Sequence, residues 1–100
     1  MAKGYWVSVY QKIIDKEKLS AYAEIGGPAV IENGGRFLVR GGRVIPKDDG
    51  ISERTVIVEF DSLDEAIAAY ESDAYQRALE KLKDGVIRDF RIVEGVDEIS

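Results

Sequence analysis

The segment GGRFLVRGGRV, residues 34–44, decides the fold, because two glycine pairs bracket a short apolar run that carries an arginine at each end. Asn33-Gly34 is typical of the end of a helix, where glycine accepts the left-handed conformation. Arg36 to Arg40 then predicts a strand, which Gly41-Gly42 ends. The segment therefore predicts the end of a helix and a strand in close succession.

The residues before this segment predict one strand and one interrupted helix. Gly4 to Gln11 alternates and is rich in aromatic and branched side chains, which favours a strand. Asp15 is a suitable cap for the helix that follows. Gly26, Gly27 and Pro28 predict a break in this helix, because proline has no N–H to donate and glycine costs about 1 kcal/mol in a helix interior. We therefore expect two helical pieces that meet at Gly27-Pro28.

The residues after the segment predict a surface loop, a strand, two helices and a last strand. Residues 43–54 are polar and turn-forming, and residues 55–60 (TVIVEF) are typical of a strand. Residues 62–65 have the spacing of a capping box, residues 72–73 begin a further helix, and residues 86–94 (VIRDFRIVE) form the last strand. The order β-α-β-β-α-β predicts an α+β, ferredoxin-like fold with a four-stranded antiparallel sheet and helices on one face. A length of 100 residues suits a single domain over residues 1–100.

The composition argues against several classes of site. The chain carries 14 basic and 19 acidic residues, a formal net charge of −5, so no global field attracts nucleic acid or an anionic membrane. The absence of cysteine and histidine removes the usual ligands of zinc and haem, and we expect neither a metal nor a cofactor. Without a signal peptide or a run of about 18 apolar residues, a soluble cytoplasmic protein is expected.

Strand alternation assigns each side chain to one face of the sheet. The most apolar assignment places these residues under the helices: Tyr5, Val7, Val9, Phe37, Val39, Val56, Val58, Phe60, Phe90 and Ile92. The open face then carries Trp6, Ser8, Tyr10, Arg36, Leu38, Arg40, Thr55, Ile57, Glu59, Asp89, Arg91 and Val93. On this assignment Arg36 and Arg40 point the same way, roughly 13 Å apart. A face that mixes apolar side chains with arginines is typical of an interface or a ligand site.

Four segments together resemble a known family over nearly the whole chain: AYAEIGGPAV (residues 21–30), GGRFLVRGG (34–42), AAYESDAYQ (68–76) and IVEG (92–95). The sequence is similar to the domain of unknown function 1330 family, and its Gly-Gly-Arg-x-x-x-Arg-Gly-Gly element is the most specific part. The resemblance implies the dimeric α/β-barrel superfamily, in which two ferredoxin-like subunits pack sheet against sheet. We therefore expect a homodimer through the open sheet face. Asp73 departs from the proline usual in this family, and Lys83 lies where an arginine is often found.

Two interpretations of Arg36 and Arg40 remain open. They can belong to a charge network across the sheet and the dimer interface, because desolvated charges must be paired. Its other members would be Glu59, Asp89 and Arg91. Alternatively, Arg40 anchors a small anionic or aromatic metabolite in a pocket between sheet and helices, since its guanidinium fork suits carboxylates. The other candidate ligand-binding residues are Arg36, Trp6, Tyr10 and Tyr22.

Three classes of function remain. The first is a homodimer that binds a small molecule without chemistry. The second, implied by the superfamily, is a cofactor-free monooxygenase- or isomerase-like enzyme, and the third is a purely structural or protein-interaction role. Without histidine, a general base near neutral pH requires a carboxylate of raised pKa, or a tyrosine or lysine of lowered pKa. Glu59 and Tyr10 are therefore the catalytic candidates.

Overall fold

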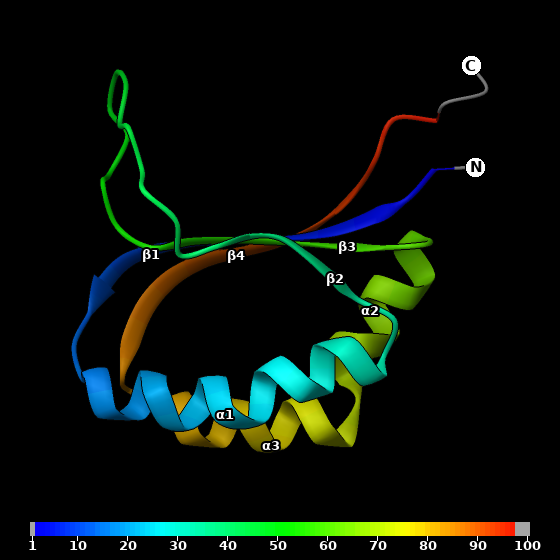
Figure 1. Ribbon diagram of the computed structural model, residues 1–100, viewed down its shortest axis with the longest axis horizontal. Helices are drawn as coiled ribbons and strands as arrows, with labels where there is room; N and C mark the ends of the chain where they lie inside the picture. The colour runs from blue at the N-terminus through cyan, green and yellow to red at the C-terminus, as the bar shows by residue number, and fades with distance from the viewer. Residues whose placement is uncertain (1, 98–100) are drawn as a thin grey trace.

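The computed structural model describes residues 2–97 as one sheet covered by helices on one face (Figure 1). The elements are β1 (Gly4–Ile13), α1 (Lys16–Glu32), β2 (Arg36–Arg40), β3 (Thr55–Phe60), α2 (Leu63–Glu71), α3 (Asp73–Leu82) and β4 (Val86–Glu94). The strands pair antiparallel in the order β2-β3-β1-β4. The predicted ferredoxin-like α+β fold is confirmed. The ends of the expected 1–100 domain, residues 1 and 98–100, lie outside the described residues.

Local side-chain chemistry sets the helix ends as predicted. The Asp15 carboxylate accepts hydrogen bonds from two backbone N–H groups in the first turn of α1, at 3.0 and 3.2 Å. The Ser62 hydroxyl accepts from the backbone N–H of Glu65 at 3.1 Å, where α2 begins. Gly34 follows α1 with a φ of +86°, which glycine adopts without strain. Of the helices within residues 2–97, none is both long and apolar enough to span a membrane.

Helix α1 is continuous, so the predicted break at Gly27-Pro28 is wrong. Pro28 lies inside the helix on its exposed side, where the loss of one backbone hydrogen bond leaves the rest of the ladder intact. A Cβ added to the buried Gly26 would lie 3.3 Å from the Tyr22 ring and 3.7 Å from Ala78 of α3. Gly26 thus packs against Tyr22 of its own helix and against α3, and this packing outweighs the low helix propensity of the segment.

Strand β1 presents the opposite face to the one predicted. Trp6 pairs with Val58 and Ile92 on the helix side of the sheet, and Trp6 and Tyr10 are only 3% and 1% exposed. Ser8 lies on this side too, whereas the open face carries Tyr5, Val7 and Val9. The prediction was wrong because both sets of residues are apolar enough for a core. The large rings of Trp6 and Tyr10 fill the space between sheet and helices, which valine side chains are too short to fill.

A bulge in β2 separates the two arginines that were expected to share a face. Arg36 pairs with Glu59 and Arg40 pairs with Val56, and the register shifts between them so that Leu38 is the extra residue. Because one extra residue reverses the alternation of side chains, Arg36 lies on the open face and Arg40 on the helix side. The prediction that both arginines point the same way is therefore wrong.

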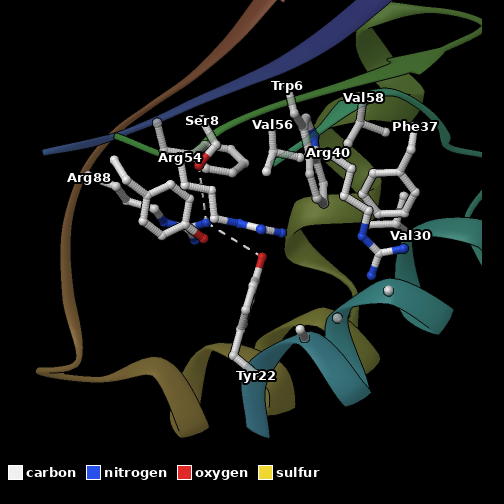
Figure 2. A pocket seen from close by; sticks show the side chains of 15 residues that line it. Trp6, Ser8, Tyr22, Val30, Phe37, Arg40, Arg54, Val56, Val58 and Arg88 are labelled. Carbon is white, nitrogen blue, oxygen red and sulfur yellow. Dashed lines mark hydrogen bonds between the residues drawn. The ribbon is translucent and has the colours of Figure 1, made fainter. Parts of the chain in front are cut away.

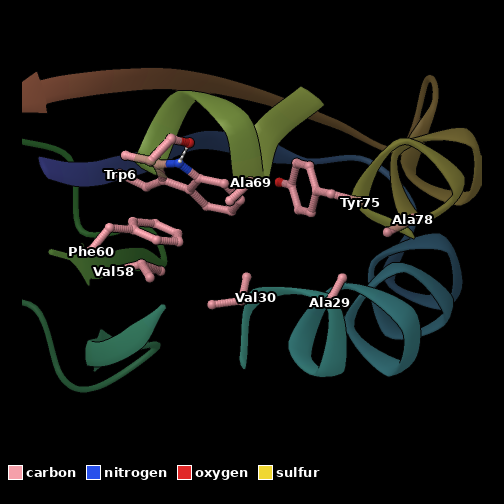
Figure 3. Close-up of a cluster of buried hydrophobic side chains, with 9 residues drawn as sticks. Trp6, Ala29, Val30, Val58, Phe60, Ala69, Tyr75 and Ala78 are labelled. Atoms are coloured by element: carbon pink, nitrogen blue, oxygen red, sulfur yellow. Dashed lines mark hydrogen bonds between the residues drawn. The ribbon is translucent and has the colours of Figure 1, made fainter. Parts of the chain in front are cut away.

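The hydrophobic core is organised around Trp6 (Figure 3). Its ring lies 4.7 Å from the ring of Tyr75, 5.1 Å from Phe60 and 5.3 Å from Phe90, between ring centroids. Its Nε1 donates a hydrogen bond to the backbone carbonyl of Ala66 in α2 at 2.8 Å. One side chain thus joins β1 to α2, α3, β3 and β4.

Candidate functional site

A pocket lies between α1 and the helix-side face of the sheet (Figure 2). All four strands and α1 contribute to it, and Arg54 adds a side chain from the residue just before β3. The apolar part of the lining consists of Trp6, Ala23, Val30, Phe37, Val56, Val58 and Phe90. The cavity has a volume of about 30 Å³, which accommodates roughly two water molecules. In this conformation it suits only a small ligand or the end of a larger one.

Three arginines, Arg40, Arg54 and Arg88, line this largely apolar pocket. Within residues 2–97, none of the three forms an ion pair with an aspartate or glutamate at up to 4.0 Å. The described lining also contains no carboxylate. Arg54 and Arg88 are partly buried and Arg40 is exposed. A partly buried guanidinium without a counter-charge is poorly solvated. The cluster therefore places positive charge at the pocket with no negative side chain beside it in the described lining.

Arg88 of β4 is held by hydroxyl groups. Its Nη2 donates to the Tyr75 hydroxyl at 3.1 Å, and its Nη1 lies 3.4 Å from both the Tyr22 hydroxyl and the Ser8 hydroxyl. Its Cζ also lies 4.7 Å from the centre of the Phe90 ring. Burial opposes the charge on Arg88, but the neighbouring tyrosines outweigh it, so the pKa of Arg88 is raised above its ordinary value. The guanidinium therefore remains charged at the inner wall of the pocket.

Two glycines make room for the other two guanidinium groups. A Cβ on Gly27 would lie 2.7 Å from Nη2 of Arg40, and a Cβ on Gly41 would collide with Nη1 of Arg54. Gly41 also has a φ of +71°, a backbone conformation that residues other than glycine rarely adopt. Gly41 of the GGRFLVRGGRV segment thus leaves room for Arg54, and Gly27 of α1 leaves room for Arg40 of the segment.

The structure brings four of the five predicted ligand-binding residues into this pocket: Trp6, Tyr10, Tyr22 and Arg40. The fifth, Arg36, lies on the open face, where its Nε donates to Glu59 at 3.2 Å and its Nη2 to Asp61 at 3.1 Å. On the same face, Arg91 pairs with Asp89 at 3.0 Å. The two interpretations therefore apply to different arginines: the network contains Arg36, and the pocket contains Arg40.

The two catalytic candidates lie on opposite faces of the sheet. Glu59 is on the open face, where a hydrogen bond from the Tyr5 hydroxyl at 3.0 Å, together with Arg36, lowers the pKa of its carboxyl group. Tyr10 lines the pocket, and burial raises the pKa of its hydroxyl. Both shifts run against a role as general base near neutral pH. The two side chains also cannot act on one ligand in this subunit.

The sequence-based prediction missed two of the three pocket arginines. Arg88 lies two residues before Phe90, so strand alternation alone places it on the covered face with that ring. Arg54 lies two residues before Val56, but the predicted strand begins at Thr55, so the alternation does not extend to it. The pairing with β1 continues just before β3 begins, because the Arg54 carbonyl accepts a hydrogen bond from the backbone N–H of Tyr10 at 2.9 Å. This pairing directs the Arg54 side chain into the pocket.

Comparison with known proteins identifies a family and a shared fold. The sequence profile of the family described as "Domain of unknown function (DUF1330)" matches residues 3–96. No curated protein sequence matches the chain. The solved structure of RPA0582, a protein of unknown function from Rhodopseudomonas palustris, has a TM-score of 0.68 at 17% identity, covering 93% of this chain and 80% of that one.

Two further solved structures are similar over nearly their full length. A dimeric ferredoxin-like protein of unknown function from Thermobifida fusca has a TM-score of 0.57 at 15% identity, covering 95% of this chain and 92% of that one. A protein from Nitrosomonas europaea, named as a candidate antibiotic biosynthesis monooxygenase, has a TM-score of 0.56 at 16% identity, covering 97% and 92%. At these identities the similarity shows the fold alone.

Proposed function

The chain belongs to the DUF1330 family, and on that premise we propose that it binds a small anionic metabolite in the pocket between sheet and helices. One observation carries this proposal: three arginines face a single pocket in which the described residues supply no carboxylate. The planar guanidinium fork suits carboxylates and other oxyanions. Aromatic walls such as Trp6 and Phe37 would contact the rest of the ligand.

Binding is favoured over proton-transfer chemistry by the character of the lining. A general base must accept a proton from the substrate near neutral pH. The described lining has no carboxylate, and burial raises the pKa of Tyr10, which keeps its hydroxyl protonated. We therefore place ligand binding ahead of the monooxygenase- or isomerase-like activity that the superfamily suggests.

Arg40→Ala is expected to remove most of the stabilisation that an anion confers. A ligand at 100 times its dissociation constant stabilises a protein by about 2.7 kcal/mol, which raises the melting temperature of a domain of this size by roughly 10 °C or more. The measurement is a melting curve of each protein with small carboxylates, phosphate and sulfate at constant ionic strength.

Arg36→Ala is the matched control, because it removes the same charge from the same strand on the opposite face of the sheet. This variant should keep the full anion-dependent shift. A shift that is lost in Arg36→Ala and kept in Arg40→Ala would place the anion outside the pocket. A wild-type protein that no anion stabilises would contradict the proposal itself.

We also propose that the open face of the sheet joins two copies of the chain. This face carries an apolar set consisting of Tyr5, Val7, Val9, Val39, Ile57 and Val93. Val93 is 43% exposed in the single chain. The segment between β2 and β3 stands out from the sheet on the side away from α1 and α3, and it exposes Ile45 and Ile51 (Figure 1). Exposed apolar surface of this extent is typical of an interface.

Ile57→Lys is expected to weaken the dimer about 30-fold or more, because it places an ammonium group between Val7 and Val39 at the centre of the face. Sedimentation equilibrium over a range of concentrations measures the change. Ile31→Lys, on the exposed surface of α1, should leave the dimer intact. A monomeric wild type, or an unchanged dimer in Ile57→Lys, would contradict this assignment.

A further inference from the structure

The inner end of the pocket holds a pair of tyrosine hydroxyls beside Arg88. The hydroxyl oxygens of Tyr22 and Tyr75 lie 2.6 Å apart, and Arg88 lies within hydrogen-bond distance of both. Figure 2 shows Tyr22 extending from α1 with its hydroxyl directed at the arginine side chains. The donors and acceptors around the two hydroxyl groups decide where their protons point.

Tyr75 is fully buried, and burial together with the nearby Tyr22 keeps its pKa far above the ordinary value, so its hydroxyl is protonated. A buried hydroxyl proton needs an acceptor, and Arg88 can only donate. Among residues 2–97, the side-chain oxygen within reach of the Tyr75 hydroxyl is that of Tyr22. Tyr75 therefore donates to Tyr22. The Tyr22 proton is then free to point into the pocket that its ring lines.

Hydrogen-bond donors consequently stand at two separate ends of the pocket. At one end, the Cζ atoms of Arg54 and Arg88 lie 6.0 and 5.8 Å from the Tyr10 ring. Arg88 also lies 3.4 Å from the Tyr22 hydroxyl. The Nε of Arg54 is buried there and has no hydrogen-bond partner in the described part of the chain. At the other end, the Arg40 guanidinium lies 4.2 Å over the Phe37 ring.

Apolar side chains line the stretch of pocket between the two ends, and the Arg54 side chain extends toward it from the Arg88 side. Figure 2 shows Trp6 and Val56 between Arg88 on one side and Arg40 on the other. A ligand that matches this lining accepts hydrogen bonds at both ends and is apolar in the middle. A compact anion such as phosphate places all its charge at one end and leaves the other unpaired.

On the premise that the pocket binds an anion, we propose that its ligand is a short dicarboxylate. One carboxylate accepts hydrogen bonds from Tyr22, Arg54 and Arg88, and the other pairs with Arg40. The short apolar chain contacts Trp6 and Val56. Because the cavity measures about 30 Å³, the chain must be short, and the exposed Arg40 is the side chain that moves outward to admit it.

Isothermal titration calorimetry of the protein with malonate, succinate and glutarate tests this assignment. Each diacid is compared with its half-amide, in which one carboxylate becomes a neutral amide of nearly the same shape, and with inorganic phosphate at equal ionic strength. We expect the best diacid to bind at least about tenfold more tightly than its half-amide, because the amide cannot form the charged contact with arginine.

Two variants and a control distinguish what each end of the pocket contributes to the affinity. Arg40→Gln should weaken the diacid about tenfold and the half-amide clearly less, because the neutral amide forms no charged contact that the substitution could remove. Tyr22→Phe should weaken both ligands by about tenfold, since each loses a hydrogen bond to a carboxylate. Tyr5→Phe, which removes a hydroxyl on the opposite face, should change neither. Should Tyr22→Phe fail to fold, the affinities of the diacid and the half-amide for wild type and Arg40→Gln still test the dicarboxylate assignment.

Equal affinity of a diacid and its half-amide would overturn the dicarboxylate assignment, as would binding of phosphate alone, and both results would leave the anion pocket in place. Arg40→Gln weakening both ligands alike would also overturn it. A wild-type protein that binds none of these anions would overturn the anion pocket together with its ligand class.

Discussion

Trp6→Ala is expected to destabilise the protein by about 4 kcal/mol. The substitution removes a side chain that is 3% exposed, packs against the rings of Tyr75, Phe60 and Phe90, and donates a hydrogen bond to Ala66. The cavity left between β1 and the helices cannot collapse without moving several elements. Because the whole stability of a domain is about 5–15 kcal/mol, this single change would bring the protein close to unfolding.

Urea denaturation followed by circular dichroism measures this loss, since Trp6 is the sole tryptophan and fluorescence would disappear with it. Tyr5→Ala is the comparison, because Tyr5 is the adjacent residue on the open face of the same strand. We expect it to cost much less than Trp6→Ala. The reverse ranking would support the strand orientation that sequence patterning predicts and would contradict the structure.

Gly4→Ala is expected to destabilise the protein by about 3 kcal/mol. A Cβ at this position would lie 2.7 and 2.8 Å from the Cα and N atoms of Leu63, and it would also collide with the carbonyl of Ser62. These are backbone atoms at the start of α2, so the clash cannot be relieved by a side-chain rotation. The start of α2 and the strand β1 would have to separate, which weakens the packing around Trp6.

Gly42→Ala is the matched control for Gly4→Ala. A Cβ at Gly42 would meet no heavy atom within 4 Å, and its φ is not in the left-handed region. Its effect on the free energy of unfolding should stay within about 0.5 kcal/mol. Thermal or urea denaturation of the two variants decides the point. Similar stabilities for both would show that β1 and α2 are not packed as closely as described.

The two faces of the sheet suit two different proposed roles. The open face is apolar, and its arginines Arg36 and Arg91 are paired with carboxylates, which is compatible with burial against a second copy. The helix side holds the arginines without carboxylate partners in the described residues, where a ligand would supply the missing charge. The bulge at Leu38 creates this division, because it directs Arg40 away from Arg36.

The sequence by itself determined the order of the elements and most of their ends. Strands β2, β3 and β4 begin and end where their composition predicts, and Asp15, Ser62 and Gly34 lie at the helix ends where their chemistry places them. These signals act within a few residues of the chain, since caps, turns and alternation depend on neighbours in sequence. The ferredoxin-like order of elements follows from them.

Only the tertiary structure decided which side chains meet in the pocket. The orientation of β1 depends on which residues fill the space under the helices, and the direction of Arg40 depends on how β2 pairs with β3. Helix α1 continues through Pro28 because it packs on α3. Arg54 and Arg88 lie 34 residues apart in sequence, and they converge because β3 and β4 both pair with β1. Long-range pairing and packing set these features, and no short stretch of sequence encodes them.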